Sequence, residues 1–181
     1  MNRRYVLLLA ALFPLAGGCR QPANTYQQAT IRWADGQACF SVADTVESRG
    51  TPPTVAAISV SEYSDGEWVR LWGWPAPLSP PTTLEPHQCI PYGHGFVEGV
   101  DKGSVVPPLV VGGRYGVQIN AQAPNPRAGG DRMVSRRYSQ HFCLQPSVSG
   151  VPTVIEVPRV RGEVAWSVCE QPATSTPRPG G

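Results

Sequence analysis

The chain has 181 residues and a formal net charge of +2 at pH 7, from 15 Lys and Arg against 13 Asp and Glu. Arg3 and Arg4 belong to the leader described next, and without them 13 basic residues stand against 13 acidic ones. Because the rest of the chain is neutral and has no basic cluster larger than Arg136-Arg137, we expect no nucleic-acid partner.

Residues 1–18 have the layout of a secretory signal peptide. Arg3 and Arg4 precede an apolar run at 5–15 that is too short to span a bilayer. The next segment, Leu15-Ala16-Gly17-Gly18-Cys19, resembles a bacterial lipobox, although Ala16 stands where that family prefers Leu. The alternative is ordinary cleavage nearby, which would leave Cys19 as a thiol.

The lipobox resemblance implies that the leader is cut after Gly18. It also implies that Cys19 is lipidated on its sulfur and acylated at the new amino terminus. Several acyl chains together anchor a protein stably to a membrane, whereas a single chain binds marginally. Arg20 stands where inner-membrane lipoproteins commonly carry Asp, so we expect the periplasmic face of the outer membrane.

Four cysteines remain after Cys19, and an even number in an oxidising compartment predicts two disulfides. Three pairings are possible among Cys39, Cys89, Cys143 and Cys169. Zinc is the competing use, but no two of these cysteines have C-x2-C or C-x4-C spacing. The histidines are not placed to complete a zinc site, so we expect no metal and no cofactor; they are His87, His94 and His141.

One domain is expected at 30–171. It follows a polar lipidated tether at 19–29 and precedes a tail at 172–181, which is low in apolar residues and expected to be disordered. A domain of this size can bury a hydrophobic core.

Two hairpins are predicted at the start of the domain. Segments 30–33 and 38–43 flank Asp35-Gly36, a strong hairpin signal. Segment 55–63 alternates apolar and polar residues and meets 68–74 across a second Asp-Gly turn.

The middle of the chain mixes loops with strands. Segment 75–86 contains five prolines and is expected to be a surface crossover. A short strand is predicted at 88–92, followed by glycine-rich loop at 93–106. The clearest strand is 114–121, and its inward residues are expected to be Tyr115, Val117, Ile119 and Ala121.

After a loop at 124–131, a strand is predicted at 136–144. Its apolar face carries Tyr138, Phe142 and Leu144. Segments 153–157 and 164–169 are predicted to form a last hairpin over Arg161-Gly162.

Eight or nine short strands, no convincing helical period, and 19 Gly with 20 Pro predict an all-β fold, an antiparallel immunoglobulin-like β-sandwich. A small closed β-barrel is the alternative. Gly113-Arg114-Tyr115-Gly116-Val117 resembles the tyrosine corner of immunoglobulin-like sandwiches.

No common catalytic signature is present in the sequence. It contains no G-x-S-x-G, H-E-x-x-H or P-loop pattern, and no G-x-G-x-x-G that opens a helix. His94 lies among glycines and His141 lies on the polar side of its strand, so both are interpreted as solvated surface residues. We therefore expect no enzymatic activity.

The segment 68–74 is rich in tryptophan. Trp68, Trp72 and Trp74 fall on one side of a regular strand together with Arg70. One hypothesis buries the tryptophans in the core and leaves Arg70 at the rim. The other exposes a Trp and Arg surface of the kind that dominates protein interfaces.

Three segments together resemble a known family. They are 37–42 (Gln-Ala-Cys-Phe-Ser-Val), 88–93 (Gln-Cys-Ile-Pro-Tyr-Gly), and Leu109 with 113–119. With the lipobox leader, they resemble the type VI secretion immunity periplasmic lipoproteins over roughly 1–145. That family implies a small all-β lipoprotein that neutralises an effector toxin reaching the periplasm. Cys143, Cys169 and the last hairpin are additional to the family pattern.

The resemblance also implies a disulfide pairing and a partner. Cys39 is expected to pair with Cys89, because both lie in the shared part, which leaves Cys143 for Cys169. The expected partner is a protein effector toxin, and an envelope structural or assembly lipoprotein is the competing interpretation. The oligomeric state stays open.

Candidate binding residues come first from the loops at 92–101 and 125–132, because loops on a rigid scaffold often carry recognition. The tryptophan-rich strand is the second choice. The candidates are Tyr92, His94, Phe96, Glu98, Asp101, Asn125, Arg127, Arg132, Trp68, Arg70 and Trp72.

Overall fold

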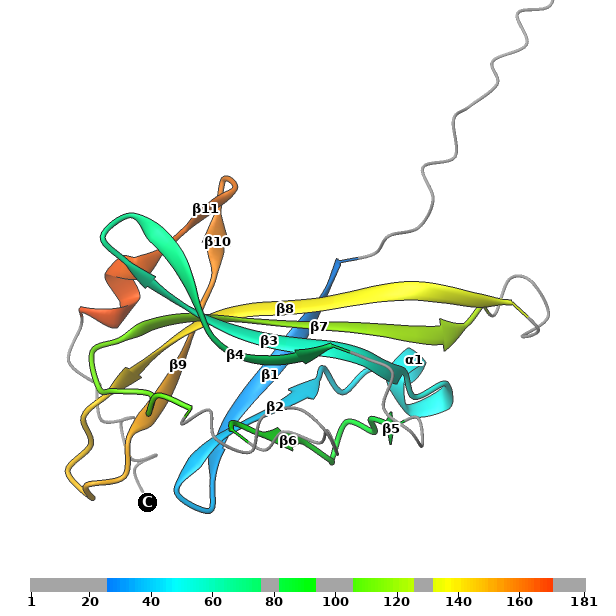
Figure 1. Cartoon of the computed structure of the whole chain (residues 1–181), viewed down its shortest axis with the longest axis horizontal. Coiled ribbons are helices and arrows are strands. Elements are labelled where there is room, and N and C mark those ends of the chain that lie inside the picture. The colour runs from blue at the N-terminus through cyan, green and yellow to red at the C-terminus, as the bar shows by residue number, and fades with distance from the viewer. Residues whose placement is uncertain (1–25, 76–81, 94–105, 126–131, 171–181) are drawn as a thin grey trace, which may run out of the picture.

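The computed structural model describes residues 26–75, 82–93, 106–125 and 132–170. Nearly all of the regular structure is β (Figure 1). The strands are β1 (Tyr26–Ala34), β2 (Gln37–Val42), β3 (Thr54–Ser64), β4 (Glu67–Pro75), β5 (Thr82–Thr83), β6 (Ile90–Pro91), β7 (Arg114–Pro124), β8 (Met133–Gln145), β9 (Thr153–Val157), β10 (Arg159–Val160) and β11 (Glu163–Val164). Two short helices are α1 (Val46–Gly50) and the 3₁₀ helix η2 (Trp166–Cys169). The all-β prediction is confirmed.

The main sheet is curled and mixed. Its strand order is β4-β3-β7-β8-β1-β2-β6, with β5 paired to β3 and β9 paired to β8. All of these pairs are antiparallel except β1 with β8. The start of β1 pairs with β8 and the rest of it pairs with β2, so β1 joins the two layers that we expected to be separate sheets.

Both predicted Asp-Gly hairpins are present, as β1–β2 and β3–β4. Asp35 and Gly36 have φ of 50° and 80°, and Asp65 and Gly66 have φ of 53° and 86°. Two successive residues with positive φ match the twist of paired strands, which is why Asp-Gly is favoured there.

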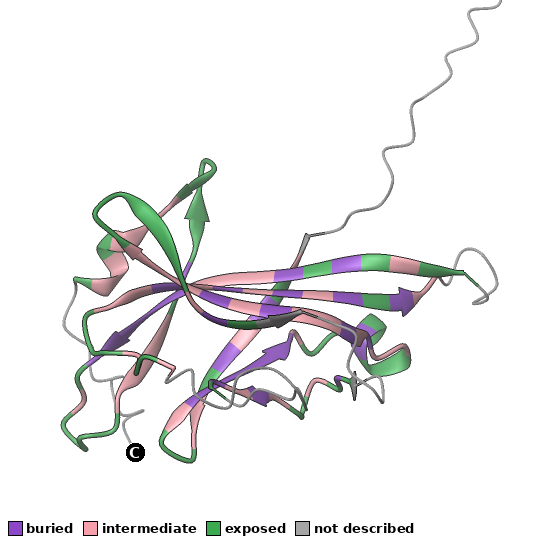
Figure 2. Cartoon of the chain, in the orientation of Figure 1, coloured by how far each residue is buried: buried purple, intermediate pink, exposed green. Residues whose placement is uncertain are grey.

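The core lies where β2 packs across from β4 and β8. The Phe40 ring centroid is 6.3 Å from that of Trp72 and 5.9 Å from that of Phe142. The four residues expected to face inward from β7 are buried, as are the three from β8. Figure 2 shows buried and less buried residues alternating along β7, as the period of two requires.

The tyrosine-corner resemblance agrees with the geometry. The Tyr115 hydroxyl accepts a hydrogen bond from the Val110 N–H at 2.8 Å and donates one to the Val110 carbonyl at 3.2 Å. A side chain at Gly113 would overlap the Tyr115 hydroxyl. The G-x-Y spacing therefore follows from the folding of Tyr115 back over its own turn.

Both expected disulfides are present. Cys39 pairs with Cys89 and ties β2 to the residue before β6, with a Cα separation of 5.5 Å. Cys143 pairs with Cys169 and ties β8 to η2, with a Cα separation of 6.1 Å.

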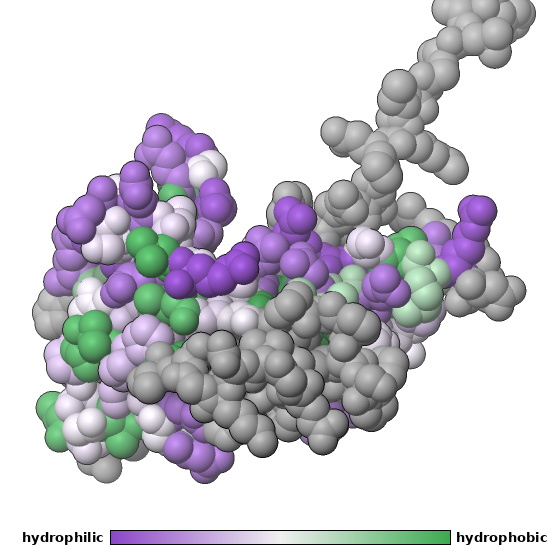
Figure 3. Space-filling model, viewed as in Figure 1, coloured by the Kyte–Doolittle hydropathy of each residue, from purple (hydrophilic) through white to green (hydrophobic). Residues whose placement is uncertain are grey.

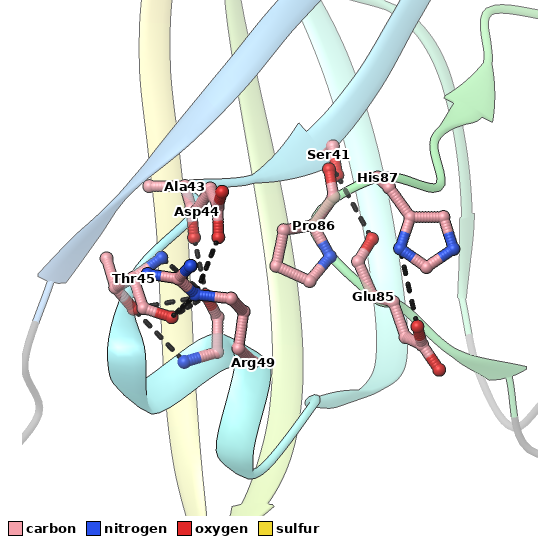
Figure 4. A network of polar contacts seen from close by, with 9 residues as sticks. Ser41, Ala43, Asp44, Thr45, Arg49, Glu85, Pro86 and His87 are labelled. Carbon is pink, nitrogen blue, oxygen red and sulfur yellow. Dashed lines mark hydrogen bonds and ion pairs between the residues drawn. The ribbon is translucent and has the colours of Figure 1, made fainter.

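A polar network holds α1 and the segment before β6 (Figure 4). The Thr45 hydroxyl accepts from the Ser48 N–H, and the Ser48 hydroxyl accepts from the Thr45 N–H, which is a capping box. The Ser41 hydroxyl donates to the Pro86 carbonyl at 3.1 Å. The sequence prediction missed α1, because a helix of five residues is too short to display a helical period.

The start of β1 and the last hairpin differ from the prediction. β1 begins at Tyr26, inside the predicted tether, because its first residues pair with β8. These residues are polar, so they lack the hydrophobic alternation that would have indicated a strand. The prediction of the last hairpin was wrong about which strands it joins. Arg161-Gly162 does form a turn, but this turn joins β10 to β11. β9 pairs instead with the open edge of β8, and most of 164–169 forms η2.

Other predictions fall wholly or partly outside the described residues. These are the leader, the lipidation at Cys19, half of the crossover at 75–86, most of the loops at 93–106 and 124–131, and the tail at 172–181.

Candidate partner-binding surface

A β-bulge at Leu71 separates the two tryptophans of β4 whose side chains are described. Val60 pairs with Trp72 while Ser61 pairs with Arg70, so Leu71 is an extra residue on β4. Trp72 is 7% exposed and packs in the core, whereas Trp68 is 45% exposed on the outer face. The prediction of a single side was wrong, and each hypothesis holds for one of these two tryptophans.

Four rings gather on the outer face of the sheet. Tyr63 of β3, Trp68 of β4, His141 of β8 and Trp166 of η2 form what we call the aromatic cluster. The Trp68 ring centroid lies 5.2 Å from that of Tyr63, 5.4 Å from that of His141 and 6.2 Å from that of Trp166. Tyr63 and Trp166 stack with their planes 10° apart.

Gly116 of β7 gives the Trp68 ring its place on the sheet. A Cβ at this position would come within 3.1 Å of two atoms of the indole. Because real Cβ atoms rarely approach other atoms so closely, a larger residue here would push Trp68 outward. The glycine therefore lets the ring lie against the backbone of β7.

Three kinds of contact hold η2 and therefore Trp166 in place. The Cys143–Cys169 disulfide is the first. The second is the Gln145 side-chain amide, which donates to the carbonyls of Val168 and Cys169. The third is Arg114, which pairs with Glu170 at 3.0 Å and places its guanidinium carbon 5.7 Å from the Trp166 ring centroid.

A polar groove of about 330 Å³ adjoins the aromatic cluster, and we call it the outer groove. Its floor is built from rows of side chains that cross β3, β7 and β8, because these strands pair in register. One row is Ser61, Gly116 and His141; the next is Ser59, Gln118 and Ser139. Arg137 and Arg159 also line the groove.

The two arginines of the outer groove are exposed and partly held by hydrogen bonds. Arg137 Nε donates to Asn120 Oδ1 at 3.3 Å, and Arg159 Nη1 donates to the Gly162 carbonyl at 3.0 Å. No Asp or Glu is among the described residues that line the groove. The groove therefore presents positive charge.

His141 joins the aromatic cluster to the outer groove. Burial, and then the nearby positive charge of Arg159, lower the pKa of His141 from its ordinary value of 6.5. The imidazole is therefore neutral at pH 7 and can both donate and accept a hydrogen bond.

Hydrophobic side chains also reach the surface near the aromatic cluster. Figure 3 shows them at the end of the molecule where the β3–β4 turn and η2 lie. On β4, Val69 is exposed, but it follows Trp68 in the strand and therefore points to the opposite face. The outer face itself combines an exposed tryptophan with arginines, which are residues typical of protein-binding sites.

The structure contradicts one candidate from the first loop. Tyr92 is buried against Phe40 and Trp72, and its hydroxyl donates to the Pro107 carbonyl at 2.8 Å. Burial raises the pKa of Tyr92 to about 12. Its apolar environment comes from the close packing of β6 on β2, so we assign Tyr92 to the core.

The remaining loop candidates are only partly described. The Asn125 N–H donates to the Arg132 carbonyl at 2.8 Å, so these residues close the base of the second loop. Arg132 is exposed, and so is Arg70, which pairs with Ser61 beside the first row of the groove. Outside the described residues lie His94, Phe96, Glu98, Asp101 and Arg127.

Four residues of this surface were missed by the sequence prediction: Tyr63, His141, Trp166 and Arg159. The expected Cys143–Cys169 disulfide could have indicated that two of them lie close together. His141 lies two residues before Cys143 and Trp166 three before Cys169, so the pairing itself brings both rings to one place.

Neither a cluster of metal ligands nor a candidate membrane-spanning helix occurs among the described residues. No group of three or more His, Cys, Asp or Glu among them is arranged to hold a metal ion. No helix among them combines the length and apolar character that crossing a membrane requires. In comparisons with known proteins, no family model, no curated protein and no solved structure matches this chain.

Proposed function

We propose that this chain is a lipid-anchored periplasmic binding protein that neutralises a type VI secretion effector toxin by docking on it. The resemblance of 37–42, 88–93 and 113–119 to the immunity lipoproteins supports the proposal. The observation that carries it is the exposed Trp68, set in the aromatic cluster beside the outer groove.

Exposed tryptophan and arginine side chains are the residues that most often dominate binding energy at protein interfaces. Here they rest on paired strands and a disulfide-tied helix, so their positions are set before the partner arrives. A preorganised surface loses little conformational entropy on binding, which increases affinity. Such a surface suits an inhibitor that blocks a toxin one to one and needs no catalytic groups of its own.

The test begins with the lipoprotein and its partners isolated from envelopes of cells whose secretion system is active. The intact mass of any partner identifies its gene. The proposal expects a partner that kills cells when exported alone to the periplasm and is harmless when the wild-type chain is present.

Two variants make this test specific to the surface. Trp68→Ala is expected to lose protection, because it removes the central ring of the aromatic cluster. Val148→Ser changes an exposed residue in the β8–β9 turn and should keep protection. A non-toxic partner from envelope assembly would instead favour a structural or assembly lipoprotein.

A further inference from the structure

We infer that the outer groove recognises an acidic segment of the partner protein, whose apolar residue packs on the aromatic cluster while its carboxylates meet Arg137 and Arg159. This inference rests on the proposed function and specifies the chemistry of the partner. It follows from the charge, the row geometry and the hydrogen-bonding groups of the groove.

The charge of the groove is the first argument. Arg137 and Arg159 line it, and Arg70 is opposite Ser61 at the edge of the first row. Among the described residues, two carboxylates are engaged elsewhere. Glu170 pairs with Arg114, and the Glu156 carboxylate accepts from Gln28 and the Ile31 N–H.

Asp65 is in the β3–β4 turn, Glu67 begins β4, and Glu163 begins β11. None of these three lines the described part of the groove. Guanidinium groups bind carboxylates through paired, charge-assisted hydrogen bonds, which makes Asp and Glu the matching side chains.

The spacing of the side-chain rows sets the length of peptide that fits the groove. Tyr63 pairs with Trp68, and further rows cross the sheet at Ser61, Ser59 and Ala57, which are every second residue of β3. The last of these rows ends at Arg137 on β8, through Asn120. The Trp68 ring lies over Gly116 in the Ser61 row, so four residues of strand at about 3.3 Å each, about 13 Å, separate it from the row of Arg137. An extended segment of about six residues is therefore long enough to contact both.

Between the Trp68 ring and Arg137, the floor of the groove carries neutral hydrogen-bonding groups. Ser59, Ser61 and Ser139 carry hydroxyls, and Gln118 carries an amide, so the floor can both donate and accept. The Trp68 ring covers Gly116 at the centre of the first row, so the open floor is the second row, of Ser59, Gln118 and Ser139. A peptide backbone laid across this row would find partners for its own N–H and C=O groups.

The probes are two capped hexapeptides, one with a terminal phenylalanine and three glutamates, the other with glutamines in place of the glutamates. Fluorescence anisotropy of each labelled peptide is followed as the detergent-solubilised full lipoprotein is added at low salt. The glutamate peptide should bind about fivefold more tightly, as two charge-assisted contacts at an exposed site allow. Added salt should remove this preference.

Matched variants locate the effect. Arg137→Gln combined with Arg159→Gln should abolish the preference for glutamate and leave binding of the glutamine peptide unchanged. Arg49→Gln, which removes an exposed charge on α1, should keep the preference. Trp68→Ala should weaken both peptides equally. Equal binding of the two peptides, no binding of either, or stronger binding of a neutral chitotetraose would overturn the inference.

The same variants separate this inference from the proposed function. A toxic effector that binds the double arginine variant as tightly as the wild type, with the same salt dependence, contradicts the acidic segment but leaves the immunity function intact. Absence of any toxic partner contradicts the immunity function, and the peptide preference is then judged by itself.

Discussion

The Tyr115 hydroxyl bonds both the N–H and the carbonyl of Val110, five residues before it in the chain. This contact fixes the turn that leads into β7, the strand beneath Trp68. Tyr115→Phe keeps the buried ring but removes both hydrogen bonds, while the Val110 carbonyl still accepts from the Gly113 N–H at 3.1 Å. Because a hydrogen bond contributes about 0.5–1.5 kcal/mol net, we expect the free energy of unfolding to fall by about that amount.

Urea denaturation measures the change in Tyr115→Phe. Tyr63→Phe is the matched control, since it retains the ring contacts with Trp68 and Trp166 at the half-exposed surface. Equal stability losses in the two variants would contradict a special role for the Tyr115 hydroxyl.

Gly113→Ala tests the same tyrosine corner by adding a methyl group against the Tyr115 hydroxyl. A Cβ at Gly113 would overlap the hydroxyl of the fully buried Tyr115, and that ring has no room to move away. Gly113→Ala should therefore lower the free energy of unfolding by about 1–3 kcal/mol, the usual cost of overpacking. Gly50→Ala is the control, because nothing lies within 4 Å of its Cβ. Thermal unfolding compares them, and an unchanged melting temperature for Gly113→Ala would refute the overlap.

Local signals in the sequence predicted much of this fold. Asp35-Gly36 and Asp65-Gly66 specify their hairpins through the backbone alone, and the alternation in 114–121 reveals the buried face of β7. The disulfide pairing followed from the family resemblance. These features depend on residues that are neighbours in sequence or on a small set of cysteines.

The parts that could not be predicted depend on distant partners. The bulge at Leu71 is defined only by the register of β4 on β3, and it alone sends Trp72 inward and Trp68 outward. The parallel pairing of β1 with β8 begins at polar residues that carry no hydrophobic period. Trp166 reaches the surface through η2, whose position is set by tertiary contacts.

The Cys143–Cys169 disulfide should support the proposed binding surface as well as the fold. The Cys143→Ser, Cys169→Ser double variant opens a loop of 26 residues, for which the chain-entropy model gives about 3–4 kcal/mol. The Cys39→Ser, Cys89→Ser control should lose similar stability in urea. Acrylamide quenching of tryptophan fluorescence should increase more in the first variant, because η2 and Trp166 loosen. Equal quenching would show that η2 is held without the bond.

His141 should make stability depend on pH. Its folded-state pKa is lowered, so below the ordinary value of 6.5 the unfolded chain binds more protons than the folded one. Stability conferred by the neutral imidazole is thus full above pH 6.5 and is lost as the pH falls below it. His141→Gln should flatten the stability curve between about pH 7.5 and 5.5. Parallel curves for the two proteins, from urea unfolding at each pH, would show that His141 does not titrate as argued.

Cys19 should decide where the protein resides. Cys19→Ser removes the sulfur that the lipobox resemblance makes the site of lipidation, so this variant should stay uncut or become soluble. Cell fractionation and intact mass measure both outcomes, with Cys39→Ser, Cys89→Ser as a control that keeps the lipobox. A Cys19→Ser protein that is still processed and membrane-bound would exclude lipidation at this position.

The most direct test of the immunity function is competition between a strain that lacks this gene and its wild-type parent. The deletion strain should be killed only when the secretion system of the parent is active. Plasmid-borne wild-type chain should restore survival, and Trp68→Ala, present at equal amounts by immunoblot, should not. A deletion strain that survives as well as its parent beside an active secretion system would contradict the proposed function.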